Sequence, residues 1–156
     1  MKNETQALHL EKMMQRHILY PAYELAFPLV SVQSKKLQAL SVDDVILTGI
    51  DVLEFILIDQ NTICANMRLK KMGNRYGLEI IDLQQEHINQ SDSKKYKNIS
   101  IVFGNVQSKT LEIGHTIDMS PINLNNVTLV LEGKTFAEGT LVNVDDEIAI
   151  QIKKVN

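Results

Sequence analysis

The sequence predicts a mainly β protein built from two similar halves, and three observations support this. Apolar and polar residues alternate with a period of two along many short segments, which is typical of half-buried strands. Gly, Asn and Asp pairs separate these segments where tight turns fit. The heptapeptide SVQSKKL at 31–37 returns as NVQSKTL at 105–111. We therefore expect short strands and turns in two copies.

The composition bounds the class of protein. A chain of 156 residues with 44% apolar residues can form a real core, either in one domain or in two small ones. A formal charge of −3, four Tyr, four Phe and no Trp disfavour a nucleic-acid surface, which needs basic clusters and stacking aromatics. We expect neither a nucleic-acid partner nor direct attraction to an anionic membrane.

The compartment follows from the cysteine and from the apolar runs. The single cysteine, Cys64, cannot form an internal disulfide, and we interpret it as a small apolar residue of a strand. The N-terminus lacks the apolar core of a signal peptide, and no run approaches the roughly 20 apolar residues of a spanning helix. These features predict a soluble, cytoplasmic protein.

Residues 1–20 form the first predicted segment, an N-terminal amphipathic helix. Ala7, Leu10, Met14 and Ile18 recur at helical spacing, and Pro21 ends the pattern. This helix either covers the protein's own core or binds a partner.

The first predicted domain spans residues 21–83, and a linker follows at 84–97. Pro28 cannot donate to a strand ladder, so its strand should lie at an edge or carry a bulge. The linker is polar, and we interpret its Lys94, Lys95 and Lys97 as solvated. The expected strands are 23–29, one from residue 45, 52–58, 63–69 and 76–83, with a helical turn at 37–40 and tight turns at 59–61 and 73–74.

The second predicted domain spans residues 98–156. Its expected strands are 99–103, one around residue 117, 127–131, 135–142 and 147–153, with turns at 104–105, 132–134 and 145–146.

Apolar positions coincide when the two halves are overlaid. The aligned pairs are Leu37 with Leu111, Ile46 with Ile117, Ala65 with Ala137, Leu69 with Leu141, Leu78 with Ile150, and Ile80 with Ile152. Matching turns and apolar positions argue for duplication. A copy of about 60 residues is marginally stable alone. We therefore expect an intramolecular pseudo-dimer with one shared core, in which strands can be exchanged between the copies.

Both halves also resemble a known domain family, the second half more closely. The leucine-spaced segment of the SPOA (surface presentation of antigens) domain is resembled by KKLQALSVDDVIL. The C-terminal half of that domain is resembled by VTLVLEGKTFAEGTLVNVDDEIAIQI, including a small-residue step at Phe136, Ala137 and Gly139. Asp43 stands where that family usually has Gly. The resemblance covers both predicted domains and implies two small intertwined SPOA-type β domains.

The resemblance implies a function in assembly. Tandem SPOA domains are typical of the cytoplasmic ring, or sorting platform, of type III secretion systems, where they bind the N-terminal segment of the ATPase's stator protein and other ring proteins with SPOA domains. The implied location is cytoplasmic, at the inner-membrane face of the secretion apparatus, with the membrane reached only through the secretion base. A flagellar motor switch component is the alternative within the family.

Residues suited to catalysis do not gather in the sequence. His9 and His17 are too far apart on one helix to chelate an ion together, and the Asp43–Asp44 and Asp145–Asp146 pairs fall at predicted turns. We therefore expect no enzyme, cofactor, metal site or small-molecule substrate. A small-ligand-binding β-barrel or hydrolase remains the alternative from another class.

Partner binding is predicted on the strands of the second half. Exposed strand edges and an apolar patch are expected to receive a partner's peptide, near Val127, Leu129 and Leu131. The same residues also fit a plain core.

Overall fold

The computed structural model describes residues 21–88, 94–119 and 122–156, which form one antiparallel sheet of eleven strands and one short helix, so the protein is mainly β as predicted. The predicted N-terminal helix lies outside the described residues. The elements are β1 (Ala22–Ala26), β2 (Val30–Gln33), α2 (Ser34–Gln38), β3 (Val45–Ile50), β4 (Glu54–Asp59), β5 (Thr62–Met72), β6 (Arg75–His87), β7 (Tyr96–Gln107), β8 (Thr116–Asp118), β9 (Asn126–Leu131), β10 (Lys134–Val144) and β11 (Glu147–Val155).

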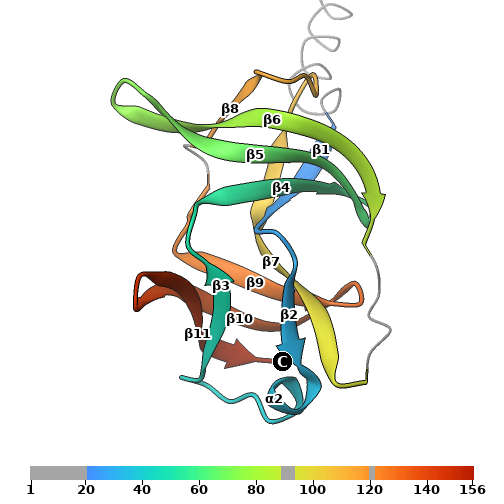
Figure 1. Cartoon of the computed structure of the whole chain (residues 1–156), viewed down its shortest axis with the longest axis vertical. Coiled ribbons are helices and arrows are strands. Elements are labelled where there is room, and N and C mark those ends of the chain that lie inside the picture. Colours follow the sequence, from blue (N-terminus) through green and yellow to red (C-terminus); the bar gives the residue numbers. More distant parts are fainter. Residues whose placement is uncertain (1–20, 89–93, 120–121) are drawn as a thin grey trace, which may run out of the picture.

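The strand order places β7 at the centre of the molecule. Neighbouring strands follow the order β3-β11-β10-β9-β7-β1-β4-β5-β6-β8, and β2 pairs with another part of β7. Figure 1 shows β4, β5 and β6 curving over one end of the molecule, while β9, β10 and β11 lie at the other end. The long strand β7 runs between these two groups.

Each half gives an edge strand to the other half. Strand β3 pairs with β11, so that Ile46 lies opposite Ile150. Strand β8 pairs with β6, so that Ile117 lies opposite Leu78. These four residues are the ones that the sequence overlay matches, Ile46 with Ile117 and Leu78 with Ile150. The two pairings therefore repeat each other in register.

The hairpins of the two halves also repeat each other in their irregularities. The β4–β5 register skips Cys64, and the β9–β10 register skips Phe136, the residue before the matched alanines. A second slip follows Asn66 in the β5–β6 pair and Glu138 in the β10–β11 pair. Matching bulges mean that the same local bend is built into both halves.

Strands β1 and β2 join the halves along β7. Ala22 lies opposite Gln107 at one end of β7, and Gln33 lies opposite Tyr96 at the other. Between them, the Phe27 amide donates a hydrogen bond to the Ile101 carbonyl at 3.0 Å. Pro28 lies in the gap between β1 and β2, so the predicted strand 23–29 ends before the proline; β1 pairs on both sides and is not an edge strand.

One main core contains residues of both halves. Phe27 packs on Phe55 with ring centroids 5.3 Å apart, and the edge of Phe103 approaches Phe27 at 4.8 Å. The fully buried side chains of this core include Leu25, Phe27, Leu57, Met67, Leu78, Ile80, Ile99, Ile101, Leu129, Ile150 and Ile152. Because both halves bury residues in the same cluster, neither half has this core by itself.

The predicted linker is strand at both of its ends. Strand β6 continues to His87, and β7 already begins at Tyr96. The polar residues at the end of β6 are held by β5: the Gln84 amide donates to the Asn66 side chain at 2.8 Å, and the His87 ring lies 3.1 Å from the Thr62 hydroxyl. These side chains are polar because they are exposed at the margin of the sheet, and this polarity is why the sequence predicted a linker here.

The predicted turn at Gly104–Asn105 is also wrong. Strand β7 passes straight through Gly104, whose φ of 151° is open to glycine. The register against β1 skips Phe103 at this point, so Gly104 lies at a β-bulge. The turns predicted at 59–61, 132–134 and 145–146 are confirmed, with positive φ at Gln60, Asn61, Glu132, Gly133, Asp145 and Asp146.

Replacing Phe27 by Ala tests the shared core. We expect Phe27→Ala to lower the free energy of unfolding by about 3–5 kcal/mol, because the residue is fully buried within an aromatic cluster. Chemical denaturation should still give one transition for both halves. The control is Tyr76→Ala, at a side chain 52% exposed, with a change within about 0.5 kcal/mol. Two separate transitions would contradict the shared core.

Asp43 and Gly114 occupy matched loops and test the conformation there. Asp43 has a φ of 74° and Gly114 a φ of 92°, and their amides donate to the Ile152 and Ile80 carbonyls, both at 2.8 Å. Nothing lies within 4 Å of a Cβ added at Gly114. Gly114→Ala should therefore destabilise by about 1 kcal/mol through backbone strain alone. Asp43→Gly should be neutral or stabilising in the same denaturation measurement, and a clear loss would refute the comparison.

Candidate functional site: a pocket between hairpin turns and a groove between strand edges

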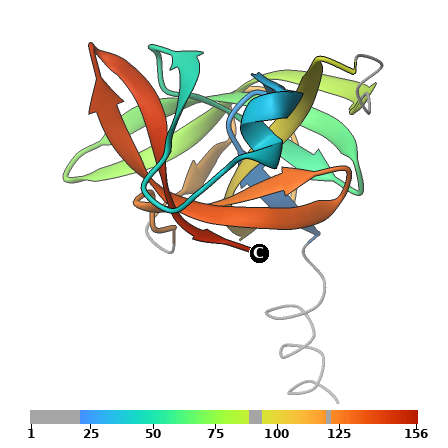
Figure 2. The ribbon, with the colours of Figure 1, turned by 90° about the horizontal axis from the view of Figure 1, so that it is seen from below.

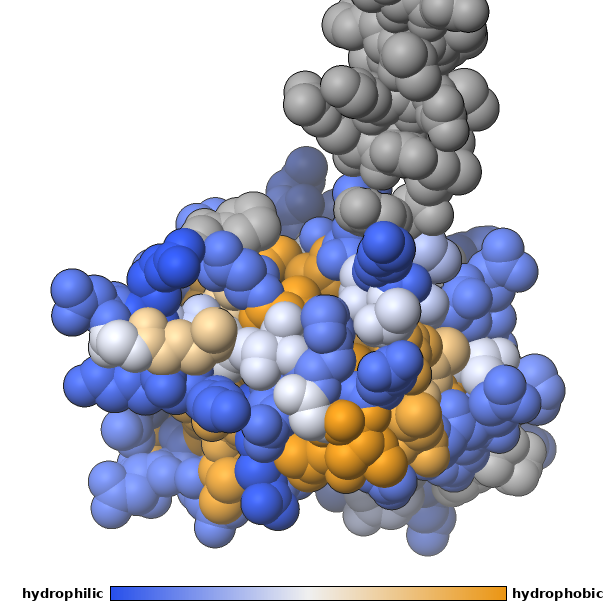
Figure 3. All heavy atoms as spheres, turned by 90° about the horizontal axis from the view of Figure 1, so that it is seen from above, coloured by the Kyte–Doolittle hydropathy of each residue, from blue (hydrophilic) through white to orange (hydrophobic). Residues whose placement is uncertain are grey.

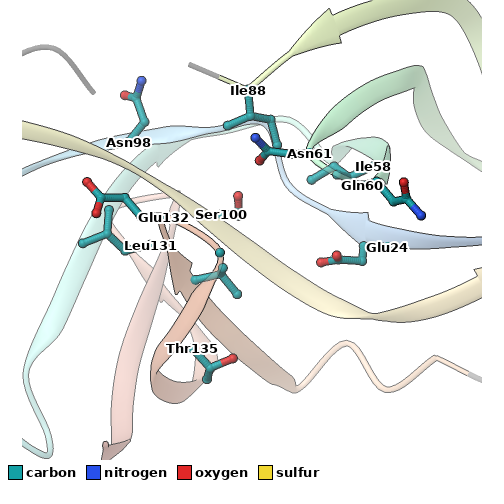
Figure 4. A pocket seen from close by; sticks show the side chains of 12 residues that line it. Glu24, Ile58, Gln60, Asn61, Ile88, Asn98, Ser100, Leu131, Glu132 and Thr135 are labelled. Carbon is teal, nitrogen blue, oxygen red and sulfur yellow. The ribbon is translucent and has the colours of Figure 1, made fainter. Parts of the chain in front are cut away.

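A pocket of about 490 Å³ lies between the β4–β5 turn and the β9–β10 turn. We call it the inter-hairpin pocket. Figure 4 shows Gln60 and Asn61 from the first turn and Glu132 from the second, with Ser100 of β7 between them. The remaining lining residues are Glu24, Ile58, Ile88, Asn98, Val130, Leu131, Gly133 and Thr135.

The inter-hairpin pocket has an apolar floor and acceptor-rich walls. Ile58 and Val130 line it and belong to a second, smaller apolar cluster with Ala26, Ile56, Ile63 and Val102. Figure 4 shows the carboxylates of Glu24 and Glu132 on opposite sides of the pocket. The Lys97 ammonium lies 3.8 Å from the Glu132 carboxylate. Two carboxylates and several amides suit a donor-rich group better than an anion.

Cys64 lies at the bulge of β5, half-buried beside a separate hollow that Tyr23 and Asp59 also line. Its thiol lies 3.5 Å from the Thr62 carbonyl, to which it donates. Burial is the larger cause and the charge of Asp59 the smaller cause that raise the pKa of the Cys64 thiol. A backbone hydrogen bond at Asp59 lowers that pKa, but not enough to cancel the rise. Burial likewise raises the pKa of Tyr23. A raised thiol pKa leaves little of the nucleophilic thiolate at neutral pH.

The other candidate chemical groups of the sequence stay apart. His87 contacts Thr62, and His115 accepts the Ile80 amide through its backbone carbonyl at 2.8 Å. The Asp44 carboxylate accepts the Ser41 amide at 2.9 Å, which is a turn contact. Within the described ranges, no group of three or more His, Cys, Asp or Glu side chains could hold a metal ion. His9 and His17 lie outside those ranges.

The predicted partner-binding residues fall mostly in the core. Val127 is 3% exposed and Leu129 is fully buried, because alternate side chains of β9 face inward. Leu131 is half-buried and lines the inter-hairpin pocket. Of the three residues, only Leu131 reaches a surface that a partner can contact.

A second hollow, of about 420 Å³, separates β2 from β3, and we call it the β2–β3 groove. Sequence reasoning missed it. Val32 and Ile46 are buried at its base, and Val45 and Leu47 stand beside them with 46% and 58% exposure. Figure 2 shows α2 next to this part of the molecule, and the helix contributes Lys36 to the groove.

A basic hollow adjoins the groove. Gln33 and Tyr96 line both, and the second hollow adds Ser34, Lys35, Lys94 and Lys95. Lys36 and Lys94 come from elements far apart in sequence, so the four lysines gather only in the folded chain. In the sequence, this basic hollow is indicated by two pairs of adjacent lysines, at 35–36 and at 94–95.

Apolar side chains reach the surface elsewhere too, but in restricted areas. Figure 3 shows apolar atoms gathered toward the middle of one face, with hydrophilic residues around the margin. Across the described residues, the large apolar side chains at least 36% exposed are Val42, Val45, Leu47, Val52, Leu53, Met72, Tyr76, Leu83, Tyr96, Ile113 and Val155. Three of them, Val45, Leu47 and Tyr96, line the β2–β3 groove.

Comparison with known proteins gives no relative: no protein-family model matches the chain, and no curated protein matches it. In the part of the chain that the structure describes, no helix has the length and apolarity needed to cross a membrane.

The raised pKa of Cys64 predicts slow alkylation. The rate of reaction with iodoacetamide should keep rising above the pH at which free cysteine levels off, because burial and Asp59 favour the protonated thiol. Asp59→Asn should shift the midpoint of this profile to lower pH by removing the charge. Asp51→Asn, in an exposed loop, is the control. A midpoint below that of free cysteine would contradict the assignment.

Proposed function

We propose that this protein is a non-enzymatic scaffold of the cytoplasmic ring, or sorting platform, of a type III secretion system. The observation that supports it most is the reciprocal pairing of β3 with β11 and of β8 with β6 in matching register. Such pairing is what two intertwined copies of one small β domain would form. On this proposal the chain is an intramolecular pseudo-dimer of two SPOA-type domains, at about residues 21–83 and 98–156.

The architecture suits a rigid docking block. Every strand of the two halves is tied into one sheet, and the main core draws on both halves. The SPOA resemblance supplies the partners: the N-terminal segment of the stator protein of the secretion ATPase, and other ring proteins with SPOA domains. Contact with the membrane would then be indirect, through the secretion base, with the protein at its cytoplasmic face.

Within the same family, a flagellar motor switch component is the alternative. The tandem arrangement favours the secretion ring, because single SPOA domains are the usual form in the switch proteins that resemble this chain. The two assignments predict different partners, so identifying the bound proteins separates them.

A small-ligand-binding protein is the second candidate, and the inter-hairpin pocket is the observation that favours it. A volume of about 490 Å³ falls in the size range of small-molecule sites. However, the lining includes two carboxylates, Glu24 and Glu132, whereas most ligand sites are lined chiefly by apolar side chains with few polar groups.

Affinity capture from a lysate that expresses a type III secretion system tests the proposal. The tagged full chain should recover the stator protein together with its ATPase, identified by quantitative mass spectrometry. The matched control is the Phe27→Ala chain, which weakens the shared core and should recover less of both. Recovery of flagellar rotor proteins instead would redirect the assignment, and recovery of neither set would contradict it.

A further inference from the structure

The β2–β3 groove lies between two strands that each have one unpaired edge. Within the described residues, β2 pairs only with β7, and β3 pairs only with β11. Figure 1 shows β2 and β3 running side by side above α2, and residues of both strands line the same hollow. Unpaired strand edges offer backbone donors and acceptors to another extended chain. Here two such edges border one groove.

The side chains around the groove favour an apolar occupant along most of its length. Val32 and Ile46 are 6% exposed at its base, and Leu40 of the following loop is half-buried beside them. Val45 and Leu47 present their side chains outward from the edge strand. An added strand with apolar residues at alternate positions would cover these side chains and remove them from water.

The end of the groove near α2 is basic. Lys36 lines the groove itself, and Lys35, Lys94 and Lys95 line the hollow that continues from it past Gln33 and Tyr96. The acidic residue in the groove lining is Asp44, whose carboxylate already accepts the Ser41 amide. Four lysines at one end select an acidic segment rather than a neutral or basic one.

Ser34 gives independent evidence for a binding partner at this end of the groove. Its hydroxyl is buried and has no hydrogen-bond partner among the described residues. The matched serine of the second half, Ser108, donates its hydroxyl to the Thr110 carbonyl at 2.7 Å. Buried hydroxyls normally have partners, so the unpartnered Ser34 hydroxyl marks a difference between the two halves. The backbone differs as well, because Ser34 begins α2 whereas the matched residues 108–112 form no helix.

The second half also shows which groove residues the fold does not require. Ile46 and its match Ile117 are both buried and pair in the same register. Their neighbours differ: Thr116 and Asp118 stand where the first half has Val45 and Leu47. Thr110 likewise stands where the first half has Lys36. Lys109 does match Lys35, but the apolar pair and Lys36 have no counterpart in the second half, although both halves have the same strand arrangement.

We propose that the β2–β3 groove binds an extended peptide of a partner protein by strand addition, with alternating apolar residues against Val45 and Leu47 and an acidic cluster against the lysines near α2. The inference deepens the scaffold proposal by giving the chemistry of a docking segment. It rests on the groove itself and applies to a scaffold of any assembly. A second copy of this chain is the less favoured occupant, because β8, whose outer edge is unpaired, carries Thr116 and Asp118 in place of an apolar pair.

Selection from a random-peptide display library on the full chain tests the proposal. The probe is then the enriched peptide, synthesised with a fluorescent label and measured by fluorescence anisotropy. Enriched peptides should alternate apolar residues and carry two or more acidic residues at one end. Enrichment of peptides without that pattern, or no enrichment above an unrelated protein, would overturn the proposal.

Two variants and a matched control locate the binding. Leu47→Asp should weaken the peptide by at least about tenfold, because it places a charge against the apolar residues, and the double variant Lys36→Glu, Lys94→Glu should do the same through repulsion. Both alter exposed side chains, so circular dichroism should show an unchanged fold. The control combines Ile113→Asp and Lys109→Glu, at exposed positions of the second half, and should bind normally. Loss of binding only in the control would place the peptide elsewhere.

Hydrogen exchange separates strand addition from docking of side chains alone. On peptide binding, exchange should slow at amides of β2 and β3 and stay unchanged at β8. Unchanged exchange at β2 and β3 would overturn strand addition. Analytical ultracentrifugation of the free chain tests whether a second copy of the chain occupies the groove. Self-association that Leu47→Asp abolishes would assign the groove to a second copy. Capture of the stator and ATPase by the Leu47→Asp chain would refute the groove as their docking site while leaving the scaffold proposal intact.

Discussion

The antiparallel contact of β1 and β2 with β7 is the constraint on which the remaining structure depends. One strand of the second half receives two strands of the first half, at opposite ends and with Phe27 between them. This contact fixes the halves side by side. Once they are fixed, β3 reaches β11 and β8 reaches β6, so that each of these two strands covers the edge of a longer strand of the other half. The aromatic cluster around Phe27 fills the space at the crossing.

The same constraint decides where edges remain unpaired. Among the described residues the sheet does not close on itself: it ends at β3 on one side and at β8 on the other. Because β2 leaves β1 at Pro28 and turns along the far end of β7, its outer edge comes to lie opposite β3. The groove is therefore a product of how the halves are joined. Val32 and Ile46, which line the groove, also belong to the shared core, so the packing of both halves holds its two sides.

Much of the fold could be predicted from sequence because turns are chosen locally. Residues such as Asn61, Gly133 and Asp146 tolerate positive φ, and the strands on either side follow the alternation of apolar residues. Pairing partners were beyond such reasoning, since alternation says which face is buried and not which strand lies alongside. Likewise, Gln84 and His87 read as linker because edge residues are polar. The strand predicted from residue 45 is present, but the sequence did not show that Val45 and Leu47 would be exposed while Ile46 faces the core.

The β2–β3 groove could not be predicted from the sequence for a further reason, and the same reason makes the comparison of the two halves useful. Its lysines and its apolar pair come from separate segments, so only the folded chain brings Lys36, Lys94 and Leu47 to one place. Two halves with matching register act as a control on each other. Where both halves carry the same buried residue, as at Ile46 and Ile117, the fold accounts for it. Where one half exposes Leu47 and the other Asp118, the fold does not require the leucine, and its place beside Val45 on an unpaired strand edge is the feature that the proposed peptide would cover.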